Sequence, residues 1–415
     1  MPKSSFLQEA QARGFIFQAT DLEGLDEALS KGQISAYIGF DPTADSLHVG
    51  SLVQLMLLRL LQKHGHKPVA LLGGGTAQIG DPSFREEARS LMTQEVIDAN
   101  LKGIEQNIRQ IVTIDNGPNS GILVDNAEWL KKLPYIELLR DVGIHFSVNR
   151  MLSFDSVKTR LDREQGLSFL EFNYSILQSY DFRELNRRYG TVLQMGGSDQ
   201  WGNIVSGVEL VRRMEGKQVF GLTAPLLTTS SGAKMGKTAK GAVWLNAEKC
   251  SIFDFWQFWR NTEDADVGKF LKLFTDLPIE ECERLAALPG AEINEAKKIL
   301  ATEVTAICHN RAAAEQAQQA AQETFEQGKL AQTGLPEITL PASELAVGIP
   351  AFKLFALSHL SNSNAEARRL IRGGGAKLND QKIEDEGQII TTNDLHENVL
   401  KLSAGRKIHL LVKFQ

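Results

Sequence analysis

The stretch Tyr37-Ile-Gly-Phe-Asp-Pro-Thr-Ala-Asp-Ser-Leu-His-Val-Gly-Ser51 decides how the first half of this chain folds. It begins in a short apolar run and leads into the segment 47–64, where apolar residues recur at helical spacing until Gly65. The loop therefore places the free N–H groups of a helix N-terminus at the end of a strand, a geometry that suits phosphate. A purely structural turn is the alternative that composition alone leaves open.

Four further apolar runs share the strand pattern. They begin at Lys67, Gly121, Thr191 and Val219, and amphipathic stretches separate them. Short strands that alternate with helices are typical of a parallel sheet joined by crossover helices. Residues 1–229 are therefore predicted to form an α/β sheet domain.

The remaining chain changes character three times. Residues 230–248 hold a small-residue loop, and 249–330 lack the strand pattern and carry apolar residues at helical spacing, which predicts an α-helical domain. Residues 331–346 are rich in Pro and Gly and are predicted to be a linker. The last part, 347–415, has the patterns of a helix, a hairpin and a final strand, and is predicted to be a small α+β domain. A length of 415 residues fits such a division.

Composition excludes several classes of protein. A net charge of −6 excludes a strongly basic nucleic-acid coat. No apolar run approaches the roughly 20 residues of a membrane helix, and the first residues lack an apolar signal core, so we expect a cytoplasmic protein without membrane contact. Three widely spaced cysteines predict neither a disulfide framework nor a structural metal site.

Charge is unevenly distributed along the chain. Residues 346–415 contain ten basic and seven acidic side chains, so this tail is +3 and the rest of the chain is −9. Such an asymmetry hints at an anionic partner of the tail, although a random surface is an equally good explanation of so small an excess.

Two more loops follow predicted strands. Residues 73–83 and 196–203 are rich in glycine, which lets a backbone approach a ligand closely, and Asp199 could accept ribose hydroxyls. Three such loops at one sheet edge predict a nucleotide crevice. The stretch 231–238 places Lys234, Lys237 and Thr238 in a small-residue loop that could clamp a polyphosphate, although lysine-rich loops are usually just solvated.

A polar stripe runs along one predicted helix. Tyr174, Gln178 and Asp181 are spaced to lie on one face, and Leu170 and Leu177 flank that face. Because apolar residues border the stripe, we expect it to line a buried pocket; a solvated helix face is the alternative.

The chain resembles the bacterial tyrosyl-tRNA synthetases, a family of class I aminoacyl-tRNA synthetases, over essentially its whole length. Five segments carry the resemblance: Tyr37–Ser51, Gly80–Ser83, the helix with Tyr174, Gly196–Gly202 and Lys234–Thr238. The two signature motifs of the class read HVGS and KMGKT here. The resemblance implies a Rossmann-like catalytic domain, followed by the helical domain and a small RNA-binding domain of a ribosomal-protein type.

The resemblance also implies a reaction. The family activates L-tyrosine with ATP to tyrosyl-adenylate, releases pyrophosphate, and passes the tyrosyl group to the terminal ribose of tRNA(Tyr). Carried over to this sequence, Tyr37 and Asp181 would bind the phenol hydroxyl, and the amino-acid backbone would be held by Asp81, Tyr174, Gln178 and Gln200. Phenylalanine would leave buried polar groups unpaired, and this family is itself the known example of such rejection.

The nucleotide would occupy the motif loops. The resemblance places Thr43 and His48 at the phosphates, with Lys234, Lys237 and Thr238 closing over pyrophosphate and Mg²⁺ bound to the phosphates. Around the adenosine it places Gly39, Gly50, Gly197 and Asp199. Asp41, close to the reacting groups, and Ser51 complete the expected ATP-binding residues. Two positions depart from the family. Ser51 replaces the second histidine that is usual in the first motif. Where the family often has Gly-Lys after the Asp-Pro-Ser segment, this chain has Phe-Arg, and the basic Arg85 and Arg89 are expected near the pyrophosphate or the tRNA acceptor end.

The family is a homodimer, and its tRNA is expected to span both subunits. In the tail, the basic side chains that would contact tRNA are Arg368, Arg369, Arg372 and Lys377. Two alternatives remain: a tryptophanyl-tRNA synthetase, which shares both motifs, and an RNA-binding scaffold without catalysis. The phenol-binding pair argues against the first, and the complete set of site residues argues against the second.

Overall fold

The computed structural model describes residues 2–82, 92–164, 166–230, 232, 235–238, 241–325, 335–396, 399–405 and 408–415. The chain forms two compact units, each made of two segments. The first comprises Met1–Asn246 and Thr262–Ala296, and the second Ala247–Asn261 and Lys297–Gln415. No helix among the described residues is long and apolar enough to cross a membrane.

A six-stranded sheet forms the centre of the first unit. Its strand order is β1-β6-β5-β2-β3-β4, with β1 antiparallel to β6 and all other neighbours parallel. The strands are β1 (Gln18–Ala19), β2 (Ser35–Phe40), β3 (Lys67–Leu72), β4 (Ile122–Asp125), β5 (Thr191–Gly197) and β6 (Phe220–Ala224). All five predicted strands are present, and the predicted α/β class with a Rossmann-like parallel sheet is confirmed. The two-residue β1 was missed because it is too short for a periodic signal.

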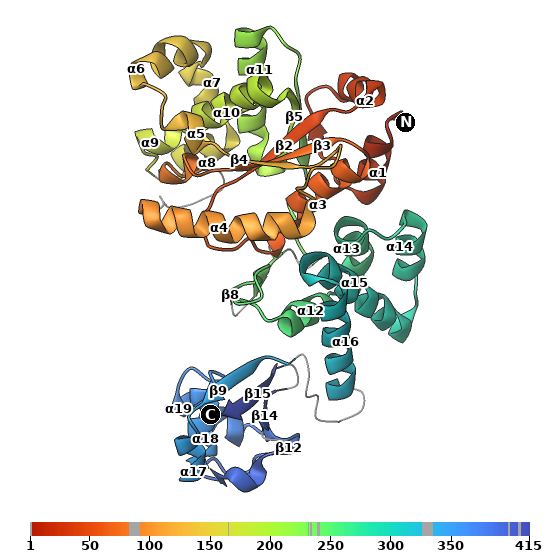
Figure 1. The fold of residues 1–415 in the computed structure, drawn as a ribbon, viewed down its shortest axis with the longest axis vertical. Coiled ribbons are helices and arrows are strands. Elements are labelled where there is room, and N and C mark those ends of the chain that lie inside the picture. Colours follow the sequence, from red (N-terminus) through yellow and green to blue (C-terminus); the bar gives the residue numbers. More distant parts are fainter. Residues whose placement is uncertain are drawn as a thin grey trace. The chain divides into compact units, whose positions relative to one another are not determined.

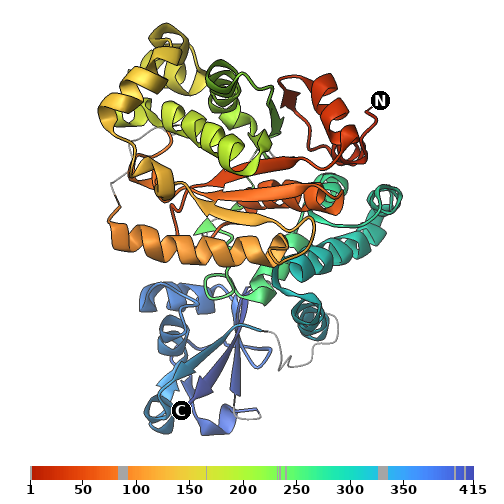
Figure 2. The ribbon, with the colours of Figure 1, turned by 45° about the horizontal axis from the view of Figure 1, so that its top comes forward.

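Helices cover both faces of this sheet. Figures 1 and 2 show α3 and α4 on one face and α10 and α11 on the other. The main helices of the unit are α1 (Ser5–Arg13), α2 (Leu22–Lys31), α3 (Val49–Lys63), α4 (Gln94–Ile111), α10 (Tyr174–Tyr189), α11 (Trp201–Glu215), α13 (Val267–Phe274) and α14 (Ile279–Ala286). Shorter helices are α5 (Ala127–Leu130), α6 (Tyr135–Glu137), α7 (Val148–Leu152), α8 (Asp155–Asp162) and α9 (Phe169–Phe172).

The strand order reverses between β2 and β5. From β2 the chain proceeds outward through β3 to β4, whereas β5 and β6 lie on the other side of β2. At such a reversal the loops after the two central strands diverge and leave a crevice at their carboxyl ends. The loop of 41–48 and the loop beginning at Gly196 leave the sheet at this point.

The second unit contains helices and a separate five-stranded sheet. Its helical part has α12 (Ile252–Arg260), most of α15 (Ile293–His309) and α16 (Arg311–Phe325), and Trp256 Nε1 donates a 3.0 Å hydrogen bond to Thr302 Oγ1. The sheet has the order β12-β11-β14-β15-β9. Its strands are β9 (Glu337–Leu340), β11 (Ala376–Leu378), β12 (Gln381–Lys382), β14 (Val399–Ala404) and β15 (Ile408–Phe414). Helices α17 (Ala342–Ala346), α18 (Ala351–Leu357) and α19 (Asn364–Arg372) pack with it around a core that includes Leu354, Phe355 and Leu402.

The described part of the stretch expected to be a linker, 335–346, is ordered structure. It contains α17 and β9, and β9 pairs in parallel with β15. Proline and glycine mark the ends of these short elements here, which is why the composition suggested a linker. The predicted hairpin through 376–382 is present, and Asn379 and Asp380 turn it with positive φ angles of 47° and 65°. The predicted domain boundaries themselves stay a prediction.

Candidate active site

A cavity of about 640 Å³ opens at the strand-order reversal. Its walls come from β2, the loop after it, the start of α3, the middle of α10 and the loop after β5. It brings together fourteen of the predicted site residues: Tyr37, Gly39, Asp41, Thr43, His48, Gly50, Ser51, Asp81, Tyr174, Gln178, Asp181, Gly197, Asp199 and Gln200. The polar stripe of α10 thus faces a cavity, as predicted. The reason given for it was wrong in part, because Leu170 lies on the separate helix α9 and is 39 % exposed.

Tyr37 lies at the deep end of the cavity. The side chain sits on β2, is 1 % exposed, and packs its ring 5.2 Å from that of Phe182. Among the described residues, its buried Oη has no hydrogen-bond partner. Burial, and then the nearby Asp181 carboxyl, raises the pKa of Tyr37 well above its usual value, so the hydroxyl keeps its proton. A ligand in the cavity that offers a donor or acceptor here would satisfy this group.

Asp181 on α10 is held from two directions. Asn126 Nδ2 donates to Oδ2 at 2.9 Å, and Trp129 Nε1 donates to Oδ1 at 2.7 Å. The carboxyl is 2 % exposed, and burial raises its pKa to about 8 although both donors act in the opposite direction. The two donors leave the rotamer of Asp181 fixed before any ligand binds.

A hydrogen-bonded chain connects this end of the cavity to the loop after β2. Asn126 Nδ2 also donates to Thr76 Oγ1, Thr76 donates to Asp41 Oδ1 at 2.7 Å, and Tyr174 Oη donates to Asp41 Oδ2 at 2.8 Å. Gly73 makes room for this arrangement, since a Cβ there would collide with the Asp41 carboxylate. The structure therefore places Asp41 directly against Tyr174, between the expected tyrosine and nucleotide residues.

A second polar group lies across the cavity. Gln200 Nε2 donates to Asp81 Oδ2 at 2.8 Å, and Asn203 Nδ2 donates to Gln200 Oε1 at 3.2 Å. Gln178 lines the same space and is half-buried. The carboxylates of Asp41 and Asp81 and the Tyr174 hydroxyl can all accept hydrogen bonds. Together they suit an ammonium group, which carries a positive charge and only donates.

His48 caps the N-terminus of α3. Its Nδ1 accepts the Gly50 N–H at 2.9 Å, so the neutral ring carries its proton on Nε2. The ring also lies edge-on to Trp244, with 6.2 Å between ring centres. The cap thus satisfies one helix donor, and the other ring nitrogen carries an N–H on a residue that lines the cavity.

The second motif lies against the first through backbone contacts. Val49 N donates to Val243 O at 2.9 Å, and Val243 N donates to Gly236 O at 2.9 Å. Gly236 has a φ of 84° and comes so close to Gly50 N that a Cβ would lie 3.0 Å from it. A residue with a side chain would be strained there.

Several predicted residues fall outside this description. The backbone of Lys237 and Thr238 forms the short strand β7 (Lys237–Thr238), paired with β8 (Gly241–Ala242), but their side chains are not among the described ones. Lys234, Arg85 and Arg89 lie outside the described residues. Their expected roles stay predictions.

The four predicted basic residues of the tail are all exposed on α19 and β11. Arg372 is bound to Glu386 through two hydrogen bonds of 2.7 and 2.9 Å, and the Arg368 guanidinium lies 4.0 Å from the ring centre of Phe352. Arg369 and Lys377 have no ion pair within the part of the chain that the structure describes. These two cations are the most available to an anionic partner.

Sequence reasoning missed three side chains that organise the site. Asn126 and Trp129 hold Asp181, and Thr76 joins Asn126 to Asp41. A signal for one of them existed: Asn126 directly follows β4, so it lies at the same edge of the sheet as the predicted loops. Trp129 carried no signal, because its role depends on how α5 lies against α10.

Comparison with known proteins shows the family of this chain. The family described as tRNA synthetases class I (W and Y) matches residues 29–326. The chain belongs to this family of class I aminoacyl-tRNA synthetases.

Curated relatives at 57–68 % identity are tyrosine–tRNA ligases. A tyrosine–tRNA ligase of Gluconobacter oxydans is 68 % identical over 415 residues, which is 100 % of both chains, and one of Agrobacterium fabrum is 58 % identical over 99 % of both. A C-terminally truncated mitochondrial tyrosyl-tRNA synthetase of Aspergillus nidulans is similar in structure, with a TM-score of 0.71 and 30 % identity over 78 % of this chain and 95 % of that one. The resemblance predicted from the sequence is confirmed.

Proposed function

We propose that this chain is a tyrosine–tRNA ligase that activates L-tyrosine with ATP and transfers the tyrosyl group to the 3′-terminal ribose of tRNA(Tyr). One observation carries the choice of amino acid: the buried Tyr37 hydroxyl has no partner among the described residues and lines the same cavity as Asp181. A phenol hydroxyl can both donate and accept a hydrogen bond, so it can satisfy both groups. Phenylalanine cannot, and it would leave them unpaired in a dry pocket.

The amino-acid backbone of the substrate fits the polar groups nearer the cavity mouth. Asp81, Tyr174 and Gln178 are proposed to hold the ammonium, and Gln200 to lie near the carboxylate. The bond between Gln200 and Asp81 supports this placement, since it brings a donor and an acceptor together on one wall. Asp41 faces the same space through its contact with Tyr174.

ATP is proposed to bind along the start of α3 and the loop after β5. Thr43 and the Nε2–H of His48 would donate to phosphates, and the N-terminus of α3 favours their negative charge. Gly39, Gly50, Ser51, Gly197 and Asp199 would surround the adenosine. Lys234, Lys237 and Thr238 would act on the departing pyrophosphate.

The described residues contain no group of three or more His, Cys, Asp or Glu side chains arranged to hold a metal ion. Mg²⁺ is proposed to arrive on the ATP phosphates, where it would neutralise part of their charge. The protein would add positioning and electrostatic stabilisation. The substrate carboxylate attacks the α-phosphorus and the bond to pyrophosphate breaks. A ribose hydroxyl of the tRNA later attacks the carbonyl carbon of the tyrosyl-adenylate and loses its proton, and the bond from that carbon to the phosphate oxygen breaks to release AMP.

We also propose a homodimer. Many large apolar side chains between 135 and 170 of the first unit are exposed, among them Tyr135 at 55 %, Ile136 at 70 %, Ile144 at 76 % and Phe169 at 67 %. Several exposed large apolar side chains in one stretch of sequence favour a protein interface. Sedimentation should find twice the 45.8 kDa chain mass, and Ile136→Asp with Ile144→Asp should shift it towards one chain.

The tail is proposed to bind tRNA through Arg368, Arg369, Arg372 and Lys377, and Arg85 with Arg89 to lie near pyrophosphate or the acceptor end. A cytoplasmic location stays a prediction.

The function is tested by exchange of labelled pyrophosphate into ATP with each amino acid in turn. Tyrosine alone should support exchange. Exchange that depends on tryptophan, or no exchange by protein that binds ATP, would contradict the proposal.

A further inference from the structure

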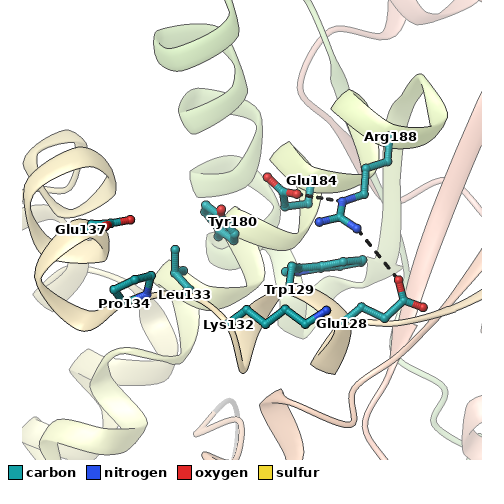
Figure 3. A pocket seen from close by; sticks show the side chains of 9 residues that line it. All are labelled: Glu128, Trp129, Lys132, Leu133, Pro134, Glu137, Tyr180, Glu184 and Arg188. Atoms are coloured by element: carbon teal, nitrogen blue, oxygen red, sulfur yellow. Dashed lines mark hydrogen bonds and ion pairs between the residues drawn. The ribbon is translucent and has the colours of Figure 1, made fainter.

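A second cavity of the first unit, about 440 Å³ in volume, lies beside Trp129. Figure 3 shows Trp129 there with Arg188, Glu184 and Glu128 around it. Trp129 lines this second cavity and at the same time donates its indole N–H to Asp181, which lines the active-site cavity. The indole therefore borders the second cavity, and its N–H binds the proposed phenol-binding carboxyl of the active-site cavity.

Trp129 is 4 % exposed and packs in a buried core cluster of the first unit, and its side chain also borders the second cavity. A ring that borders a cavity lacks neighbouring atoms on part of its surface and gains no dispersion energy there. Trp129 also lies on α5, which has only four residues, Ala127–Leu130. Contacts from outside this short helix can therefore help to keep the N–H directed at Asp181.

Arg188 supplies such a contact. Its guanidinium lies 5.0 Å from the centre of the Trp129 ring, within the range of a cation–π interaction. Two acidic side chains hold the guanidinium: Arg188 Nε lies 2.8 Å from Glu184 Oε2, and Nη1 lies 4.0 Å from Glu128 Oε2. Figure 3 shows both interactions as dashed lines above the indole.

The spacing along α10 explains why one indole can touch both partners. Asp181, Glu184 and Arg188 recur on one face over two helical turns. Trp129 meets Asp181 through its N–H and Arg188 through its ring. Arg188 in the last turn of α10 also interacts favourably with the helix dipole.

We propose that Arg188 is a positioning residue for tyrosine recognition, holding Trp129 so that its indole N–H is directed at Asp181. This inference rests on the proposed function and extends it to a side chain that does not line the active-site cavity. Because Arg188 acts only through Trp129, its replacement should change the binding of the amino acid and leave the binding of ATP unchanged.

The test compares Arg188→Gln with Arg187→Gln. Arg187 is a matched control, because it lies on the same helix and pairs with the same Glu184 at 3.2 Å, with its side chain 50 % exposed against 41 % for Arg188. In tyrosine-dependent pyrophosphate exchange, Arg188→Gln should raise the KM for tyrosine and lower the preference for tyrosine over phenylalanine, each by about fivefold, the factor expected for one cation–π contact. The KM for ATP should stay the same, and Arg187→Gln should resemble wild type. Arg188→Lys keeps the positive charge, so it should recover most of the wild-type KM for tyrosine and most of the selectivity against phenylalanine.

A double-mutant cycle separates positioning from a general loss of structure. Trp129→Phe keeps an aromatic ring but removes the N–H, so Arg188→Gln should have no added effect on tyrosine KM in that background. Additive effects, an equal effect of Arg187→Gln, or a parallel rise in the KM for ATP would overturn the inference. Wild-type protein without tyrosine-dependent exchange would instead contradict the proposed function, so the two failures are distinguishable.

Discussion

The two ends of the active-site cavity are built from different kinds of groups. At the deep end, the polar atoms belong to side chains that are almost fully buried, such as Tyr37 at 1 % and Asp181 at 2 % exposure. At the other end, the loop after β2 and the start of α3 present backbone groups, a histidine cap and the exposed Thr43.

This difference matches what each end is proposed to recognise. Backbone N–H groups and a helix N-terminus bind phosphate through charge and tolerate many side chains around them. A single hydroxyl is distinguished only by buried groups that lose their partners when it is absent. Changes at the deep end should therefore alter the choice of amino acid, and changes at the helix end should alter the reaction with ATP.

Among changes that should affect one end of the cavity and spare the other, Asp181→Asn is expected to have the largest effect. The amide would present N–H to Asn126 or Trp129, which now donate to the carboxyl, and the substrate hydroxyl would lose a partner. The kcat/KM for tyrosine should fall about 100-fold while the KM for ATP stays within a factor of two, as measured by pyrophosphate exchange. Unchanged selectivity against phenylalanine would remove Asp181 from the phenol site.

The same carboxyl should make stability depend on pH. Burial raises its pKa to about 8 in the folded protein from an ordinary value of 3.8, so the folded state holds this proton more tightly than the unfolded chain. The stability it contributes is full below pH 3.8 and is lost as the pH rises towards 8. The free energy of unfolding of wild type minus that of Asp181→Asn should fall between pH 5 and 7, by at most about 1.4 kcal/mol per pH unit. A difference that stays constant in urea titrations would contradict the raised pKa.

At the helix end, His48→Asn separates the two roles of the histidine. An asparagine oxygen can still accept the Gly50 N–H, so the cap and the stability should be kept, whereas the Nε2–H donor is lost. We expect kcat of adenylate formation to fall about 30-fold with little change in tyrosine binding. His48→Ala is the matched control, and it should also lose about 1 kcal/mol of stability. Equal stability of the two variants would argue against the cap.

Tyr37→Phe should give effects of opposite sign on stability and binding. Removal of a buried hydroxyl without a partner should stabilise the free protein by about 1 kcal/mol in thermal or urea unfolding. The KM for tyrosine should nevertheless rise about tenfold, because the substrate hydroxyl loses one partner. A less stable variant would mean that the hydroxyl is satisfied in the free protein.

The smallest effect is expected far from both ends. Arg369→Gln should raise the KM for tRNA about threefold and weaken its salt dependence, while pyrophosphate exchange stays unchanged. Arg372→Gln is the comparison, since its partner Glu386 already neutralises that charge, and it should have the smaller effect. An equal loss of pyrophosphate exchange would place these residues outside tRNA binding.

The helix end could be predicted from the sequence, because a strand, a short loop and a capped helix are adjacent in the chain. Tyr37–Ser51 forms such a unit. Local rules favour Asp45 or Ser46 as the cap of the helix, but α3 begins later and its cap is His48. The deep end could be predicted only in part. Tyr174, Gln178 and Asp181 share a helix face and were found by their spacing, but Asn126, Trp129 and Thr76 come from segments distant in sequence.

By itself, the sequence determined the alternation of strands and helices, the three loops at one sheet edge and the polar face of α10, because these depend on periodicity and on neighbouring residues. Tertiary structure alone decided that Asp181 is held by Asn126 and Trp129, that Arg188 braces the indole, and that β9 pairs with β15. Those contacts join residues that are between 50 and 80 positions apart in the chain. Strand order and helix packing bring these residues together, and neither leaves a local signal in the sequence.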